Sequence, residues 1–179
     1  GFSPTTHFAG GAPGEVGGIF WRLNKAYGYY ADRVGPLTLD TPMEAHGKLF
    51  LKFGTPDSEM CFGWFNSSQK ERKKIRVKRN ELGVIRHDPE DVHLGKTDHF
   101  LGVYMTSQRA GIELLPALVS AKGSKVVQKS NVPHINPTVI YDWSIQYDPA
   151  AAAGRGALTV KLGDQPAATL SLDPKIRQE

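Results

Sequence analysis

The side chains with the clearest chemical potential are aromatic rings that lie close to planar polar groups in the sequence. Trp21 precedes Arg22, and Trp64 lies two residues before Asn66. Such combinations could bind a sugar, because the C–H faces of a pyranose stack on flat rings while amides, carboxylates and guanidinium groups bind its hydroxyls. The residues that we expect on a ligand-binding face are Trp21, Arg22, Tyr29, Trp64, Asn66, Arg76, Asp142 and Gln146.

A basic run between residues 70 and 79 is the sharpest charge feature; it comprises Lys70, Arg72, Lys73, Lys74, Arg76, Lys78 and Arg79. In an extended chain, Lys74, Arg76 and Lys78 would share one face at a spacing of about 6.6–6.8 Å. That spacing could follow the carboxylates or sulfates of an acidic glycan, or phosphates. Lysines also protect exposed edge strands from aggregation, and this reading is favoured. A nucleic-acid partner is not expected at a net charge of only +4.

Sequence patterns typical of catalysis are scarce. The chain has no Gly-x-Ser-x-Gly string, and its six histidines lack metalloprotease spacing. Polar residues from His87 to His99 could hold a metal or an acid–base pair, but loops are commonly polar without function. We therefore assign no catalytic residue and no metal ligand. An enzymatic alternative would draw on Glu59, Arg76, His87 or His99, and Tyr104.

The C-terminal part predicts the elements that would position these groups. Apolar residues alternate with polar ones in three successive runs, and a period of two indicates half-buried strands. The turn 163–166 lies between the last two runs, which predicts a hairpin. Trp143 belongs to the apolar parity and is expected in the core. The alternating apolar residues are Val139, Tyr141, Trp143, Ile145 and Tyr147, then Leu158, Val160 and Leu162, then Ala168, Leu170 and Leu172.

Further strands are predicted along the rest of the chain, at residues 16–22, 46–53, 59–66, 100–106 and 112–120. The segment 60–65 is apolar on both parities, which predicts a central strand covered on both faces. Pro116 predicts an edge or a bulge, and the best helix candidate is a single turn at 89–94. About nine or ten short strands favour an all-β fold, a two-sheet antiparallel β-sandwich of the jelly-roll type.

Length and composition are consistent with one folded domain. With 179 residues, 40% of them hydrophobic, the chain can bury a sizeable core. We expect an irregular lead-in at residues 1–15, a single sandwich domain at 16–174 and a tail at 175–179. The single cysteine, Cys61, excludes an internal disulfide. No apolar run approaches the length of a membrane-spanning helix, so no membrane span is expected.

Three C-terminal segments carry a resemblance to a known superfamily: residues 143–149 (WSIQYDP), 154–160 (GRGALTV) and 168–170 (ATL). Residues 62–66 and 100–104 look like its central strands. In these motifs the chain resembles the concanavalin A-like lectin/glucanase superfamily, which includes laminin-G-like modules and many carbohydrate-binding modules. The resemblance covers residues 15–173.

The resemblance implies that the concave face of a curved sheet binds a glycan, and that the only cofactor, if any, is a structural calcium. Laminarinase-type enzymes of the superfamily carry Glu-x-Asp-x-x-Glu, and its alginate lyases carry Arg-x-Glu-x-Arg and Gln-Ile-His. This chain has none of these strings. No family catalytic residue is therefore carried over.

The leading hypothesis is a non-catalytic carbohydrate-binding module that recognises a polysaccharide, possibly acidic. It would belong to a larger secreted or cell-surface protein. The alternatives are a glycoside hydrolase or polysaccharide lyase of the same fold with an unfamiliar site, and a structural or protein-interaction domain.

Overall fold

The computed structural model describes residues 34–52, 59–65, 99–108, 111–120, 125–127 and 130–177. The chain divides into two compact units, Gly1–Thr38 and Leu39–Glu179. Residues 34–38 of the first unit form no helix or strand, and every described element belongs to the second. The predicted domain boundary at residue 16, the predicted strand at 16–22 and the predicted helical turn at 89–94 lie outside the described residues.

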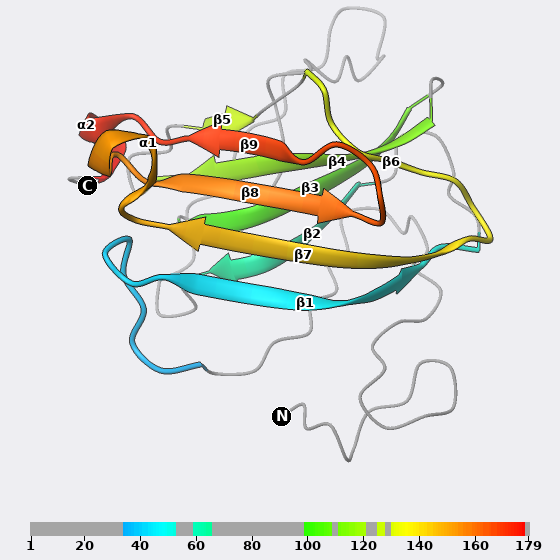
Figure 1. The fold of residues 1–179 in the computed structure, drawn as a ribbon, viewed down its shortest axis with the longest axis horizontal. Coiled ribbons are helices and arrows are strands. Elements are labelled where there is room, and N and C mark those ends of the chain that lie inside the picture. The colour runs from blue at the N-terminus through cyan, green and yellow to red at the C-terminus, as the bar shows by residue number, and fades with distance from the viewer. Residues whose placement is uncertain are drawn as a thin grey trace, which may run out of the picture. The chain divides into compact units, whose positions relative to one another are not determined.

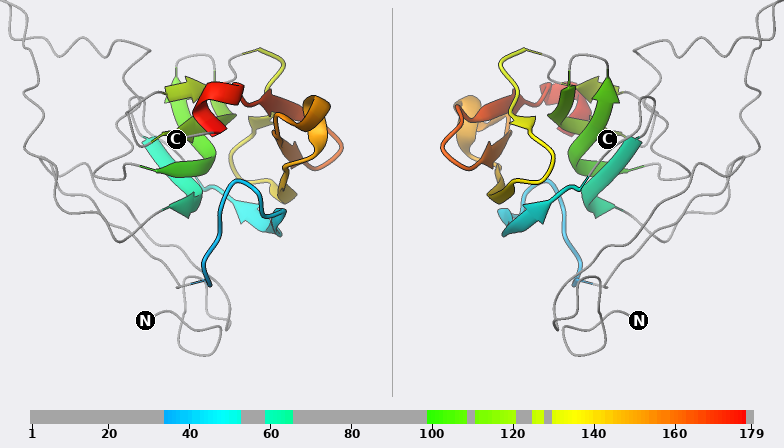
Figure 2. Two further views of the ribbon diagram at one scale, coloured as in Figure 1. Left: turned by 90° about the vertical axis from the view of Figure 1, so that its left-hand side faces the viewer. Right: turned by 90° about the vertical axis from the view of Figure 1, so that its right-hand side faces the viewer.

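The second unit is built from two antiparallel sheets, as expected for an all-β sandwich (Figures 1 and 2). The first sheet has the order β1 (Met43–Phe50), β7 (Ile140–Asp148), β8 (Ala157–Leu162), β9 (Ala168–Ser171). The second has the order β2 (Glu59–Phe65), β3 (Phe100–Gln108), β4 (Gly111–Val119), β5 (Lys125–Val127), and β6 (His134–Ile135) also pairs with β4. Two four-residue helices, α1 (Ala151–Gly154) and α2 (Pro174–Arg177), complete the described elements.

The predicted alternation is confirmed within β7, β8 and β9, but Val139, which was expected on the apolar parity, precedes β7 and is exposed. In β7, Ile145 and Tyr147 are buried, while Asp142 and Gln146 on the other parity are exposed. The predicted turn at 163–166 joins β8 to β9, and Leu158 pairs with Leu170 across the hairpin. The period-two pattern of the sequence therefore predicts where these strands lie and which face of the sheet their side chains take.

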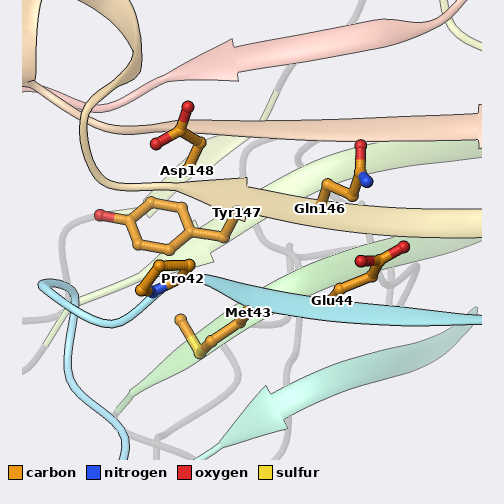
Figure 3. A pocket seen from close by; sticks show the side chains of 6 residues that line it. All are labelled: Pro42, Met43, Glu44, Gln146, Tyr147 and Asp148. Atoms are coloured by element: carbon orange, nitrogen blue, oxygen red, sulfur yellow. The ribbon is translucent and has the colours of Figure 1, made fainter.

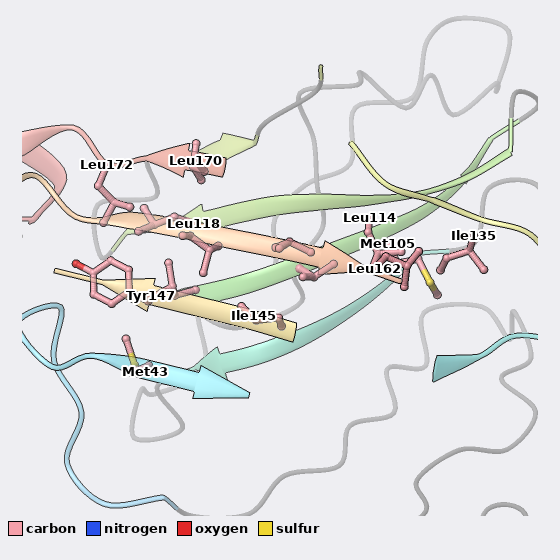
Figure 4. Packing of buried hydrophobic residues seen from close by; sticks show 14 of the residues in the cluster. Met43, Met105, Leu114, Leu118, Ile135, Ile145, Tyr147, Leu162, Leu170 and Leu172 are labelled. Carbon is pink, nitrogen blue, oxygen red and sulfur yellow. The ribbon is translucent and has the colours of Figure 1, made fainter. Parts of the chain in front are cut away.

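The core lies between the two sheets (Figure 4). Side chains of the first sheet, such as Ile145 and Leu162, pack there with side chains of the second, such as Leu114 and Leu118. Each of these four is at most 3% exposed. Full burial of such a side chain contributes about 1.5–3 kcal/mol, so this cluster is the main source of stability.

Among the described strands, the segment 60–65 does not take the expected central position. β2 pairs with β3 and has no second strand neighbour among the described residues, whereas β3 lies between β2 and β4. The segment is apolar on both parities because both of its faces find apolar contacts. Met60, Phe62 and Trp64 pack against the core between the sheets, and Cys61 and Phe65 pack against a second cluster. Coverage of both faces does not require a neighbour on both edges.

Pro116 lies in an interior strand and not in an edge strand. β4 pairs with β3 along its whole length, and on its other side with β6 at Ile112 and Glu113 and with β5 from Ala117 onward. Pro116 falls between these two paired stretches. A residue without an N–H is tolerated there because no described strand pairs with that side of β4 at this point.

Candidate functional site

The two sheets differ in how their outward faces are covered. On β3, Leu101 and Val103 are buried between the sheets, and Phe100 and Tyr104 are buried in the second cluster on the opposite parity. On the first sheet, most side chains of the second face are instead exposed. We call this surface the outer face; its residues are Glu44, His46, Lys48, Phe50, Ile140, Asp142, Ser144, Gln146, Asp148, Thr159, Lys161, Thr169 and Ser171.

Antiparallel pairing brings outer-face side chains into rows across β1 and β7. Glu44 lies opposite Gln146, His46 opposite Ser144, Lys48 opposite Asp142, and Phe50 opposite Ile140. Side chains directly opposite one another on one face have Cβ atoms about 4.5–5.5 Å apart and interact. The strands therefore present four adjacent pairs, which change from polar at one end to apolar at the other.

The charges on the outer face are mixed and exposed to solvent. Lys48 Nζ donates a hydrogen bond of 2.7 Å to Asp142 Oδ1, and the two side chains are 70% and 78% exposed. His46 Nδ1 lies 4.0 Å from Glu44 Oε1. At such exposure these pairs add little to stability, about 0–1 kcal/mol each. Their side chains are instead available to a ligand.

A shallow depression of about 430 Å³ marks the polar end of this region (Figure 3). Pro42, Met43 and Glu44 line it from the start of β1, and Gln146, Tyr147 and Asp148 line it from the end of β7. Tyr147 and Met43 are buried and form its apolar part. Asp148 Oδ1 accepts a hydrogen bond of 2.8 Å from the backbone N–H of Ala150. Two carboxylates and an amide thus surround the depression, and all of them can accept hydrogen bonds from hydroxyls.

The opposite end carries an exposed apolar group, of which the sequence analysis named only Val139, as a residue of the apolar parity. Phe50 is 54% exposed, Ile140 is 64% exposed and the neighbouring Val139 is 42% exposed. The available signal was that Phe50 and Ile140 are apolar residues on the polar parity of their strands. An exposed ring next to the Lys48–Asp142 pair is the aromatic and polar combination expected of a sugar site, at different residues.

The predicted site residues are placed as follows. Asp142 and Gln146 lie on the outer face, on one strand and four residues apart. Trp64 is half-buried in β2 and packs against the core between the sheets, so it does not join them. Trp21, Arg22, Tyr29, Asn66 and Arg76 lie outside the described residues, as does the whole basic run. Trp143 packs against the core as expected, and its ring meets Phe62 edge-on, 5.3 Å between centroids.

Of the residues of the enzymatic alternative, Glu59, His99 and Tyr104 belong to the described part of the chain. Tyr104 is 6% exposed and lies in the second cluster. His99 is half-buried and precedes β3. Glu59 begins β2, and Arg76 and His87 lie outside the described residues. Within the described ranges, no group of three or more histidine, cysteine, aspartate or glutamate residues could hold a metal ion.

No family model, curated protein or solved structure matches the chain. The resemblance to the concanavalin A-like superfamily therefore stays a prediction. Among the described helices, none has the length and apolar character needed to cross a membrane.

Proposed function

We propose that this chain is a non-catalytic carbohydrate-binding module that binds a polysaccharide on its outer face. The observation that carries the proposal is the exposed Phe50–Ile140 pair beside the hydrogen-bonded Lys48–Asp142 pair on an open sheet surface. The jelly-roll, concanavalin A-like form of the sandwich belongs to the same proposal. So does the assignment to a larger secreted or cell-surface protein.

The dimensions of the outer face suit an extended chain of sugars. From Glu44 to Phe50 the surface runs along about 20 Å of strand. A sugar stacked on Phe50 would have its hydroxyls within reach of Lys48 and Asp142, and further units would lie along the strands toward Gln146. Each sugar would contact polar side chains that are already exposed, so binding would require little rearrangement of the protein.

The charges favour a neutral polysaccharide at this surface. Glu44, Asp142 and Asp148 supply three carboxylates against the ammonium groups of Lys48 and Lys161. A polymer of uronic acids or sulfated sugars would be repelled by the carboxylates. Binding of an acidic glycan by the basic run of residues 70–79 remains a separate prediction, as does a structural calcium.

Affinity gel electrophoresis with neutral and acidic polysaccharides tests the proposal. Phe50→Ala and Gln146→Ala are expected to weaken retention by a neutral polysaccharide about tenfold. Val34→Ala is the matched control, because it shortens an equally exposed apolar side chain in the other unit. Unchanged retention of both variants, or no retention of the native chain by any polysaccharide, would contradict the proposal.

A glycoside hydrolase is the second candidate, favoured by one observation. The carboxylates of Glu44 and Asp148 line the same depression, and glycosidases act through two carboxyl groups. Release of reducing ends from a polysaccharide, lost in both Glu44→Gln and Asp148→Asn, would support this function. Binding without release of reducing ends supports the module.

A further inference from the structure

β1 is an edge strand whose side chains carry a self-complementary pattern. Within the described residues it pairs with β7 and has no second strand neighbour. An edge strand presents unpaired N–H and C=O groups along its free side. On the outer face its polar side chains follow one another as acid, imidazole and base, at Glu44, His46 and Lys48.

We propose that two copies of this chain pair through antiparallel β1 strands and form a homodimer. In a register centred on His46, Glu44 lies opposite the partner's Lys48, and Lys48 lies opposite the partner's Glu44. The two-fold axis produces both ion pairs from one surface, as an isologous interface requires. Oppositely charged side chains directly opposite one another stabilise a strand pair, and like charges destabilise it.

The same register also matches the inner parity of the strand. Met43 lies opposite the partner's Leu49, and Ala45 lies opposite the partner's Gly47, so that apolar residues meet apolar residues. In the single chain, Ala45, Gly47 and Leu49 are only half-buried, whereas Ile145, Leu158 and Val160 on the neighbouring strands are buried. A partner strand would cover the side of these residues that the sheet leaves open.

Neighbouring registers satisfy the pattern less well. Only even shifts keep the apolar residues on one face. A shift of two residues in one direction places Glu44 opposite the partner's His46, and in the other direction places Lys48 opposite the partner's His46. Shifts of four residues place Glu44 opposite the partner's Glu44, or Lys48 opposite the partner's Lys48. Among these registers, the one centred on His46 therefore gives two oppositely charged pairs.

The existing contact of Lys48 is compatible with this arrangement. Lys48 Nζ is hydrogen-bonded to Asp142 and its side chain remains 70% exposed, so two of its three N–H donors can serve a second carboxylate. The partner's Glu44 would extend the row Asp142–Lys48 across the interface. Lysine alone on an edge strand opposes strand addition, whereas a strand with both charges accepts its own antiparallel copy.

Dimerisation is a property separate from the proposed carbohydrate binding and does not depend on it. Joining two four-stranded sheets makes one continuous sheet of eight strands, with both outer faces on the same side. Any ligand that repeats along a polymer would then be bound by two sites at once, and its apparent affinity would rise without a new contact.

Light scattering after size-exclusion chromatography, and sedimentation velocity, measure the oligomeric state of the full chain. The native chain is expected to be dimeric. Glu44→Lys and Lys48→Glu each place like charges opposite one another twice and are expected to be monomeric. An equimolar mixture of the two restores opposite charges at both pairs and is expected to form a heterodimer. The double variant Glu44→Lys/Lys48→Glu is expected to dimerise again.

Two controls separate the interface from other effects of charge. Lys161→Glu makes the same charge change on the outer face of β8, away from the edge, and is expected to remain dimeric. Asp142→Asn removes the intramolecular partner of Lys48 and leaves the β1 pattern intact, so it too is expected to remain dimeric. Circular dichroism establishes that each variant is folded.

Three results would overturn the proposal: a native chain that stays monomeric up to about 0.1 mM, reversed single variants that remain dimeric, or a mixture that stays monomeric. If a charge reversal prevents folding, Glu44→Gln and Lys48→Gln replace it. Each neutral variant is expected to raise the dimer dissociation constant severalfold, with no recovery on mixing, and an unchanged constant would count against the interface.

Discussion

The side chain of Tyr147 occupies the space that a side chain at Gly156 would need. A methyl group at position 156 would lie 2.6 Å from the hydroxyl oxygen of Tyr147 and 3.1 Å from its ring. Gly156 also has φ of +90°, a conformation that side chains rarely adopt. The tyrosine hydroxyl continues past it and donates a hydrogen bond of 2.7 Å to the carbonyl oxygen of Leu39. This contact fixes the end of β7 against the segment that leads into β1.

Gly156→Ala is expected to lower the free energy of unfolding by about 2–4 kcal/mol, because it adds both an overlap with Tyr147 and backbone strain. Gly154→Ala is the matched control. Its φ is +79°, but nothing lies within 4 Å of the added carbon, so only the backbone strain of about 1 kcal/mol applies. Urea denaturation measures both values, and equal losses would show that the ring contact is unimportant.

Tyr147→Phe is expected to lower the free energy of unfolding by about 1 kcal/mol. The ring and its contact with Gly156 remain, while the carbonyl of Leu39 loses its donor. Tyr141→Phe serves as a comparison, since the Tyr141 hydroxyl accepts a hydrogen bond from the Asn136 N–H at 3.2 Å in a more exposed position. We expect the loss at Tyr141 to be the smaller one in urea denaturation, and the reverse order would argue against the assigned role of Tyr147.

The C-terminal strands were predictable because the signal is local. Leu158, Val160 and Leu170 alternate with polar residues, and a sheet with one wet face imposes that pattern residue by residue. The lateral position of β2 was not predictable in this way, because strand order depends on partners distant in sequence. β1 is also shifted: its predicted range was 46–53, and its observed range, Met43–Phe50, follows its pairing with β7.

The candidate site was predictable in part for the same reason. Asp142 and Gln146 have the outward parity of β7, and both lie on the outer face. Phe50 was missed because Leu49 and Leu51 define the apolar parity of its strand, and the exposure of a ring on the other parity depends on what covers that face. The pairing of Lys48 with Asp142 joins residues 94 positions apart. No local pattern encodes such a contact.

Gly102 and Gly63 face one another across β3 and β2, and we expect Gly102→Ala to be strongly destabilising. An added carbon would overlap the carbonyl oxygen of Phe62 and lie 2.8 Å from the α-carbon of Gly63. Backbone cannot move aside as a side chain can, so the expected loss in the free energy of unfolding is about 2–4 kcal/mol. Gly35→Ala, with nothing within 4 Å, is expected to change it by less than about 0.5 kcal/mol. A tolerated alanine at 102 would mean that β2 pairs with β3 less closely than described.

The short segment α1, between β7 and β8, contains two alanines in a left-handed conformation, which offers a route to stabilisation. Ala152 has φ of 54° and Ala153 has φ of 59°, and a side chain in this region costs about 1–2 kcal/mol. Ala153 is exposed, so Ala153→Gly removes the strain without leaving a cavity. The expected result is a gain of about 0.5–1 kcal/mol in the free energy of unfolding, after the greater chain entropy of glycine is subtracted. Ala167→Gly, at an exposed alanine without positive φ, is expected to destabilise by a similar amount. The opposite signs of the two changes, measured by urea denaturation, distinguish relief of strain from a general effect of glycine, and a loss at both positions would contradict the left-handed turn.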